Sequence, residues 1–197
     1  MKKLLRPVPV LALAAALTAG GCSTNTQGDD PSPVYLTTEY RLLLAGKCVN
    51  EPTLMQFEQV NLTSHLKGAA TPGDSGFMDT QVESYTVVWR RVDGGKTASA
   101  PETFAGMTLV PAAGTSTLRN WPFMSIAALQ KAPLDQLFPF NGGVDRETGN
   151  VEIRQSGTVT WYGHTMSGQP VTSVPAPFEM SFLYCSTTGK VEMRRTR

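Results

Sequence analysis

The residues that could carry hydrolytic chemistry are one serine in a glycine-rich stretch and two histidines. Ser75 lies in Gly-Asp-Ser-Gly, a pattern that surrounds some nucleophilic serines. A serine nucleophile needs a histidine base within hydrogen-bond reach and a carboxylate that orients this base. His65 precedes Ser75 by only ten positions in an unrelated context, and His164 is remote in sequence. These spacings favour a glycine-rich loop, and a hydrolase remains the alternative.

A second stretch is similar to part of a phosphate-binding loop. Gly94-Gly95-Lys96-Thr97 matches its end, but the full pattern needs a further glycine at the position of Arg90 and a helix after the threonine. The chain continues instead with a strand-like segment that contains Pro101. Asp93-Gly94-Gly95 therefore predicts a tight reversal between two strands, because glycine reaches positive φ without steric cost.

The sequence does not predict a metal or another cofactor. A zinc site needs three or four convergent ligands, and the two histidines lack a nearby cluster of cysteines or carboxylates. Asp145 and Glu147 lie in a turn whose spacing does not match a calcium loop. The three tryptophans, Trp89, Trp121 and Trp161, could line a groove, but two of them lie in predicted strands at positions compatible with the core, which favours packing.

The start of the chain has the parts of an export signal. Basic residues precede a short apolar run that ends in small residues and Cys22. The run is about ten residues, whereas a membrane-spanning helix needs roughly 20. Leu-Thr-Ala-Gly-Gly-Cys resembles the lipobox of bacterial lipoproteins. The resemblance implies a diacylglyceryl group on Cys22, cleavage before it, and, with Ser23 next, a preference for the outer membrane.

The rest of the chain divides into a tether, one domain and a tail. We predict a signal peptide at 1–21, a lipidated cysteine with a flexible tether at 22–33, a β domain at 34–186 and a basic tail at 187–197. Of 17 Lys and Arg, three lie in the signal, so 14 remain against 16 Asp and Glu. This mildly acidic mature chain lacks the basic footprint of a nucleic-acid binder.

The two remaining cysteines are expected to pair. With Cys22 lipidated, Cys48 and Cys185 form an even number in an oxidising compartment. A disulfide would join the first and last strand regions, and two separately buried thiols are the alternative.

Alternation and turn signals predict an all-β fold of about eight short strands. Apolar residues recur at period two in 35–44, 55–66, 81–92, 97–104, 107–110, 151–162, 171–174 and 178–185. Residues 126–137 include helix formers divided by Pro133, which predicts one or two short helical turns in a crossover between sheets. The long crossover favours a β-sandwich, and a closed barrel is the alternative.

Three segments give a family resemblance. VESYTVVWRRVDGG, NGGVDRETG and VTWYGHTMSGQPV are similar to segments of uncharacterised bacterial lipoproteins with an immunoglobulin-like β-sandwich. The resemblance implies this fold and a location in the cell envelope, and it implies no activity.

We therefore expect an envelope lipoprotein that works as a binding or structural module. Its partner would be an envelope protein or polymer, with the membrane held through the lipid on Cys22. Loops 68–79 and 141–150 are the expected contact regions, because function on such domains usually lies in loops. A periplasmic hydrolase with an unrecognised site is the alternative.

Overall fold

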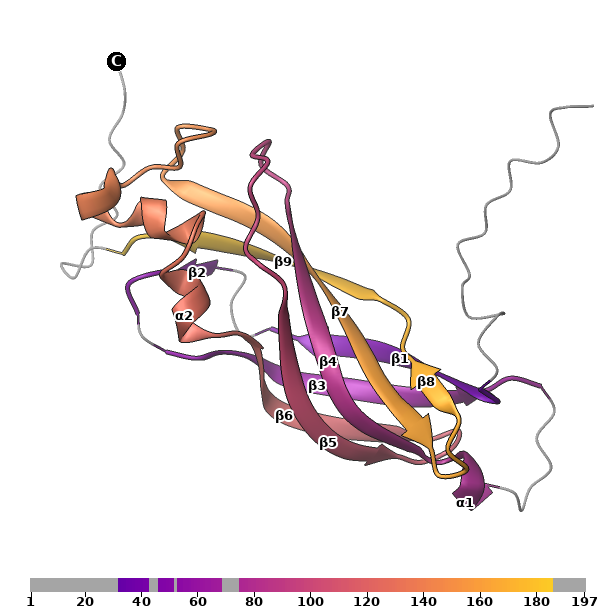
Figure 1. Cartoon of the computed structure of the whole chain (residues 1–197). Coiled ribbons are helices and arrows are strands. Elements are labelled where there is room, and N and C mark those ends of the chain that lie inside the picture. The colour runs from indigo at the N-terminus through magenta and orange to yellow at the C-terminus, as the bar shows by residue number, and fades with distance from the viewer. Residues whose placement is uncertain (1–31, 43–45, 52, 69–74, 186–197) are drawn as a thin grey trace, which may run out of the picture.

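The computed structural model describes residues 32–42, 46–51, 53–68 and 75–185. The predicted signal, Cys22, the tether up to residue 31 and the basic tail lie outside the described residues. Within these residues the chain is mostly β, with two sheets and a few short helical turns (Figure 1). No helix of the described residues is long and apolar enough to cross a membrane.

Nine strands of the described residues form the two sheets. The smaller sheet has the order β1-β3-β6, with β1 (Val34–Arg41), β3 (Met55–Leu66) and β6 (Thr115–Met124). The larger sheet has the order β2-β9-β7-β4-β5, with β8 paired to β7, and it curls into a half-barrel. Its strands are β2 (Gly46–Cys48), β4 (Thr80–Arg91), β5 (Glu102–Val110), β7 (Glu152–Thr165), β8 (Pro170–Thr172) and β9 (Ala176–Leu183).

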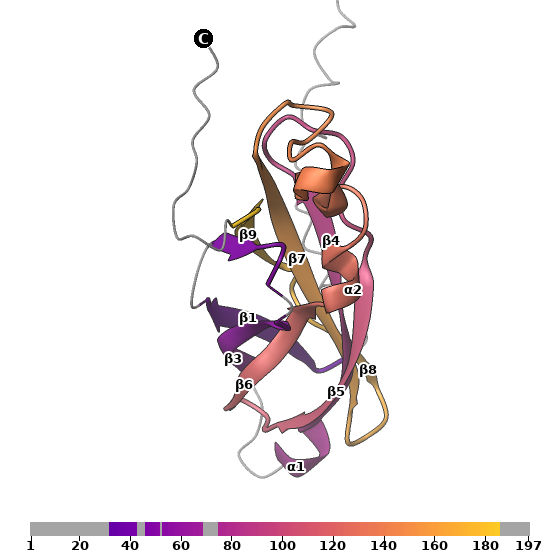
Figure 2. The same ribbon diagram turned by 90° about the vertical axis from the view of Figure 1, so that its left-hand side faces the viewer.

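The sheets face one another and are joined at one edge. Figure 2 shows β1, β3 and β6 on one side and β4, β5 and β7 on the other. A parallel bridge pairs Leu36 of β1 with Ser173, and the Val174 amide donates to the Leu36 carbonyl at 2.9 Å. The crossover from β6 to β7 contains α2 (Ile126–Leu129) and the 3-10 turns η1 (Leu134–Leu137) and η2 (Pro139–Asn141). The predicted helical crossover is thus confirmed.

Aromatic side chains from both sheets fill the space between them. The Phe57 ring of β3 lies 5.1 Å from the Phe178 ring of β9, and both residues are buried. Phe178 packs directly over Gly157 of β7, where an added Cβ would lie 2.5 Å from the ring. Tyr85 and Trp161 are fully buried with ring centroids 4.3 Å apart. Burial of these rings is the main source of cohesion between the sheets.

Several strand predictions need correction. Strand β6 was not predicted, although it completes the smaller sheet. The two strands expected at 97–104 and 107–110 are one strand that begins after Pro101. The first strand ends at Arg41, short of residue 44. The reversal at Asp93 is a ten-residue connection from β4 to β5, because the loop encloses a buried arginine, described below.

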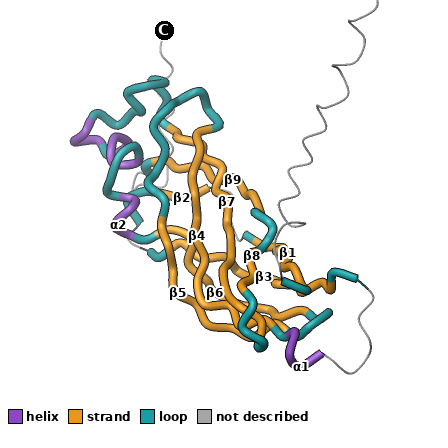
Figure 3. Tube along the Cα trace, turned by 45° about the vertical axis from the view of Figure 1, so that its right-hand side comes forward, coloured by secondary structure: helices purple, strands orange, loops and turns teal. Residues whose placement is uncertain are grey.

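The turns gather at two ends of the domain (Figures 1 and 3). One end, which we call the tip, consists of residues 75–79 with helix α1 (Ser75–Met78), the β5–β6 turn at 110–114 and the β7–β8 turn at 165–170. The opposite end, which we call the far end, consists of residues 91–97 and 130–150 with the helical crossover. The described end of the predicted contact loop 68–79, residues 75–79, and the predicted contact loop 141–150 therefore lie at opposite ends of the domain.

Candidate functional site

The residues weighed for hydrolytic chemistry lie on three different elements. His65 is on β3 of the smaller sheet, where its Nε2 lies 2.8 Å from Thr37 Oγ1 and its ring stacks on Tyr35. His164 is on β7 of the larger sheet, with Nδ1 3.4 Å from Glu83 Oε1. Ser75 begins α1 at the tip. Each histidine thus has its own partner on a different sheet.

Trp89 and Trp161 pack in the core, as their positions in predicted strands indicated. Trp161 is fully buried and Trp89 is 5% exposed. Trp121 of β6 lies 5.4 Å from Trp161, ring centroid to ring centroid, and is partly buried. These side chains stabilise the contact between the sheets rather than line an open groove.

Cys48 and Cys185 form a disulfide. Their Cα atoms are 5.3 Å apart across a sequence separation of 137. Asn50, which sequence reasoning missed, secures the same place: its side-chain amide donates to the Cys185 carbonyl at 2.8 Å, and the Cys185 amide donates back at 3.0 Å. The disulfide and Asn50 together fasten the short strand β2 to the end of β9.

A buried ion-pair network, also missed from sequence, organises the far end. The Arg91 guanidinium donates from Nε to Asp93 Oδ1 at 2.8 Å and from Nη2 to Asp145 Oδ2 at 2.7 Å. The side chains of Arg91, Asp93 and Asp145 are only 1%, 7% and 0% exposed. Gly95 covers the guanidinium, since an added Cβ there would collide with it. The glycine pair after β4 thus accommodates the buried arginine.

Hydrogen bonding keeps both carboxylates of this network charged. Burial alone would raise the pKa of Asp93, but hydrogen bonds from Arg91 and from the Arg154 and Gly95 amides outweigh it and lower the pKa to about 2. Burial and hydrogen bonding oppose each other in the same way at Asp145, and its pKa is lowered. Since the charged forms are favoured, the network is an ion pair at neutral pH.

Glu147 connects the same two loops at the surface. Its carboxylate accepts hydrogen bonds from the Thr97 hydroxyl and from the Lys96 and Thr97 amides. The Thr97 hydroxyl bond is the main cause of the lowered pKa of Glu147. Asp145 and Glu147 therefore hold loop 141–150 against loop 91–97, which is a structural use of the two carboxylates. The described residues contain no group of three or more His, Cys, Asp or Glu side chains that could hold a metal.

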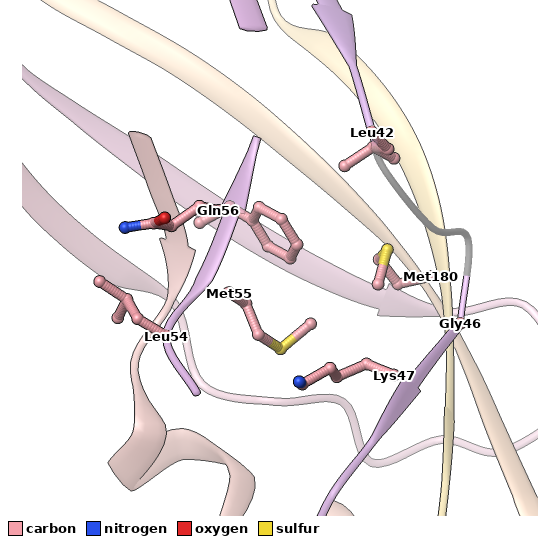
Figure 4. A pocket seen from close by; sticks show the side chains of 8 residues that line it. Leu42, Gly46, Lys47, Leu54, Met55, Gln56 and Met180 are labelled. Carbon is pink, nitrogen blue, oxygen red and sulfur yellow. The ribbon is translucent and has the colours of Figure 1, made fainter. Parts of the chain in front are cut away.

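A pocket opens between the two sheets near the disulfide (Figure 4). Its volume is about 170 Å³, and most lining side chains are apolar: Leu42, Leu54, Met55, Phe123 and Met180, with Gly46, Lys47 and Gln56. The Lys47 ammonium at this pocket binds Glu51 Oε2 at 2.7 Å and the Thr53 hydroxyl. A dry apolar cavity of about 150 Å³ can bind benzene. The pocket can thus receive one small apolar group beside a paired ammonium.

No protein-family model matches this chain, and no curated protein sequence matches it. Among solved structures, the chain is similar to one described as "X-ray structure of Northeast Structural Genomics Consortium target SoR45". The two are 10% identical, the match covers 85% of this chain and 98% of that chain, and the TM-score is 0.36. A likeness at this level carries no argument about function.

Proposed function

We propose that this protein is a lipid-anchored component of the bacterial cell envelope that works by binding a partner. The lipid anchor in this proposal is inferred from the lipobox-like segment that ends at Cys22. The observation that carries it is the Cys48–Cys185 disulfide, because disulfides persist in exported proteins and are rare in reducing compartments. An immunoglobulin-like relationship belongs to the same proposal and is supported by two facing sheets joined through a crossover.

The binding surface we propose is the pocket between the sheets. It is concave and mostly apolar, with a few polar groups at its edge, as small binding sites commonly are. It would take an aliphatic or aromatic group of an envelope protein or polymer. For the hydrolase alternative, His164 lies beside a carboxylate, with Nδ1 3.4 Å from Glu83 Oε1, but neither this exposed pair nor Ser75 lines the pocket.

Lipidation can be tested directly at the anchor. Cys22→Ser should abolish incorporation of labelled fatty acid and release the protein from the membrane fraction. Labelling that persists in this variant would contradict the anchor.

Pocket binding can be tested by photo-crosslinking in intact cells. A photoreactive residue at Leu54 should capture the partner, and one at Val88, which is on another strand and similarly exposed, should not; the exposed fractions are 44% and 48%. Leu42→Trp should obstruct the pocket and remove the adduct, because Leu42 lines the pocket and is only partly buried. Equal adducts at both positions, or loss of the cellular role in His65→Ala, Ser75→Ala or His164→Ala, would contradict binding through the pocket.

A further inference from the structure

The tip is unusually poor in charge for a set of surface turns. Its 16 residues in 75–79, 110–114 and 165–170 include one charged side chain, Asp79. The Asp79 carboxylate accepts a hydrogen bond from the Ala112 amide at 2.8 Å, so this one charged group is bonded to another turn of the tip. Surfaces that stay in water generally carry many charges. Their depletion is typical of surfaces that contact another phase or another molecule.

Two large apolar side chains project from this charge-poor surface. Phe77 is 74% exposed and Met166 is 56% exposed. They come from neighbouring turns, because the Ser167 amide donates to the Phe77 carbonyl at 3.1 Å and the Met166 amide donates to the Asp79 carbonyl at 2.8 Å. Scattered single apolar residues on a surface are ordinary. Here backbone hydrogen bonds hold the two turns next to each other, so both exposed side chains belong to the same end of the domain.

The tether joins the domain at this same end. The chain enters β1 at Val34, which pairs with Leu66, and the Lys67 amide donates to the Pro33 carbonyl at 2.7 Å. The Ser64 amide donates to the carbonyl of Gly114, a tip residue, at 2.9 Å. Figure 1 shows the start of β1 at the end of the domain that carries α1. From Ser32 back to Cys22 the chain can span at most about 35 Å, so a lipid on Cys22 would keep this end close to the bilayer.

We propose that the tip lies in the membrane interface, with Phe77 and Met166 inserted at the boundary between headgroups and acyl chains. This inference rests on the proposed lipid anchor. Apolar side chains at that depth are favourable where few charges must be desolvated. The far end, and the pocket between the sheets, then face away from the lipid and are free to meet a partner.

The test uses the lipidated protein in vesicles of phosphatidylethanolamine and phosphatidylglycerol, with and without lipids brominated on their acyl chains. Phe77→Trp is compared with Phe140→Trp at the far end, since Phe140 is 81% exposed. After subtraction of the parent spectrum, the added emission of Phe77→Trp should shift to shorter wavelength and be quenched by brominated lipid. The added emission of Phe140→Trp should change in neither respect. Met166→Trp is the second tip variant, should Phe77→Trp fail to fold.

The outcomes separate this proposal from the anchor on which it rests. If the protein floats with the vesicles but the two variants are quenched equally or not at all, the tip does not insert. If the emission of Phe77→Trp shifts only after membrane proteins are added, the tip binds a protein and the lipid proposal is wrong. If the parent protein carries no lipid and does not float with vesicles, the anchor itself has failed.

Discussion

At the far end of this domain three charged side chains are buried and paired, whereas at the tip two exposed apolar side chains lie where charge is almost absent. The far-end segments 91–97 and 130–150 contain eight charged residues, against one in the tip. Arg91 forms ion pairs with Asp93 and Asp145, and the second pair fixes loop 141–150 to the end of β4. The far end thus has a defined shape, and the tip is the end that we propose to contact the membrane.

Removal of the disulfide should have the largest effect on the free energy of unfolding. The chain-entropy model gives on the order of 4 to 5 kcal/mol for a loop of this length. Urea unfolding of Cys48→Ala/Cys185→Ala should show a loss of this order relative to the oxidised parent. The parent in reductant is the matched control and should behave alike. A loss below about 1 kcal/mol would mean that the Asn50 hydrogen bonds alone hold β2 in place.

Arg91→Met should cost about 3 to 5 kcal/mol, because it leaves the Asp93 and Asp145 carboxylates buried without a cation. The matched control is Arg90→Met, since Arg90 is exposed on the same strand and should tolerate the change. Adding Asp93→Asn and Asp145→Asn to Arg91→Met should recover part of the loss in urea unfolding. If Arg91→Met and Arg90→Met were equally stable, the far end would not depend on the buried network.

The sequence predicts those features of the two ends that depend on neighbouring residues, and it misses those that depend on distant ones. Strand β3 has the predicted bounds, Met55 to Leu66, because its burial alternates along most of its length. The disulfide follows from counting cysteines. Strand β6 was missed because it contains Pro122, which is tolerated where a strand lies at the edge of a sheet, as β6 does beside β3.

The site depends more on partners distant in sequence. The sequence does contain a signal for Arg91. It follows Trp89 by two positions on β4, so the alternation of the strand places it on the buried face, where an apolar residue is usual. Nothing local identifies Asp145, 54 positions away, as its partner. The pocket likewise combines residues from β2, β3, β6 and β9, which only the fold brings together.

Acid should weaken the far end before it affects the tip. The Asp93 pKa is about 2, below the ordinary 3.8, so the unfolded chain binds a proton more readily than the folded protein does. The stability from this group is full above about pH 4 and is lost as the pH falls toward 2, on the order of 2 kcal/mol. The thermal midpoint of the parent should therefore fall more steeply than that of Asp93→Asn between pH 4 and 2. Parallel curves would show that Asp93 does not contribute to acid sensitivity.

Changes at the tip should have the smallest effect on folding. Phe77→Ser and Met166→Ser should each alter the free energy of unfolding by no more than about 0.5 kcal/mol, because both side chains are already exposed in the folded protein. Phe182→Ser is the matched control: Phe182 is fully buried, and its loss should cost about 3 to 5 kcal/mol. A cost of about 2 kcal/mol or more for Phe77→Ser would show that this ring packs within the domain. The exposed apolar surface of the tip would then be too small to serve a membrane, and the contrast between the two ends would rest on charge alone.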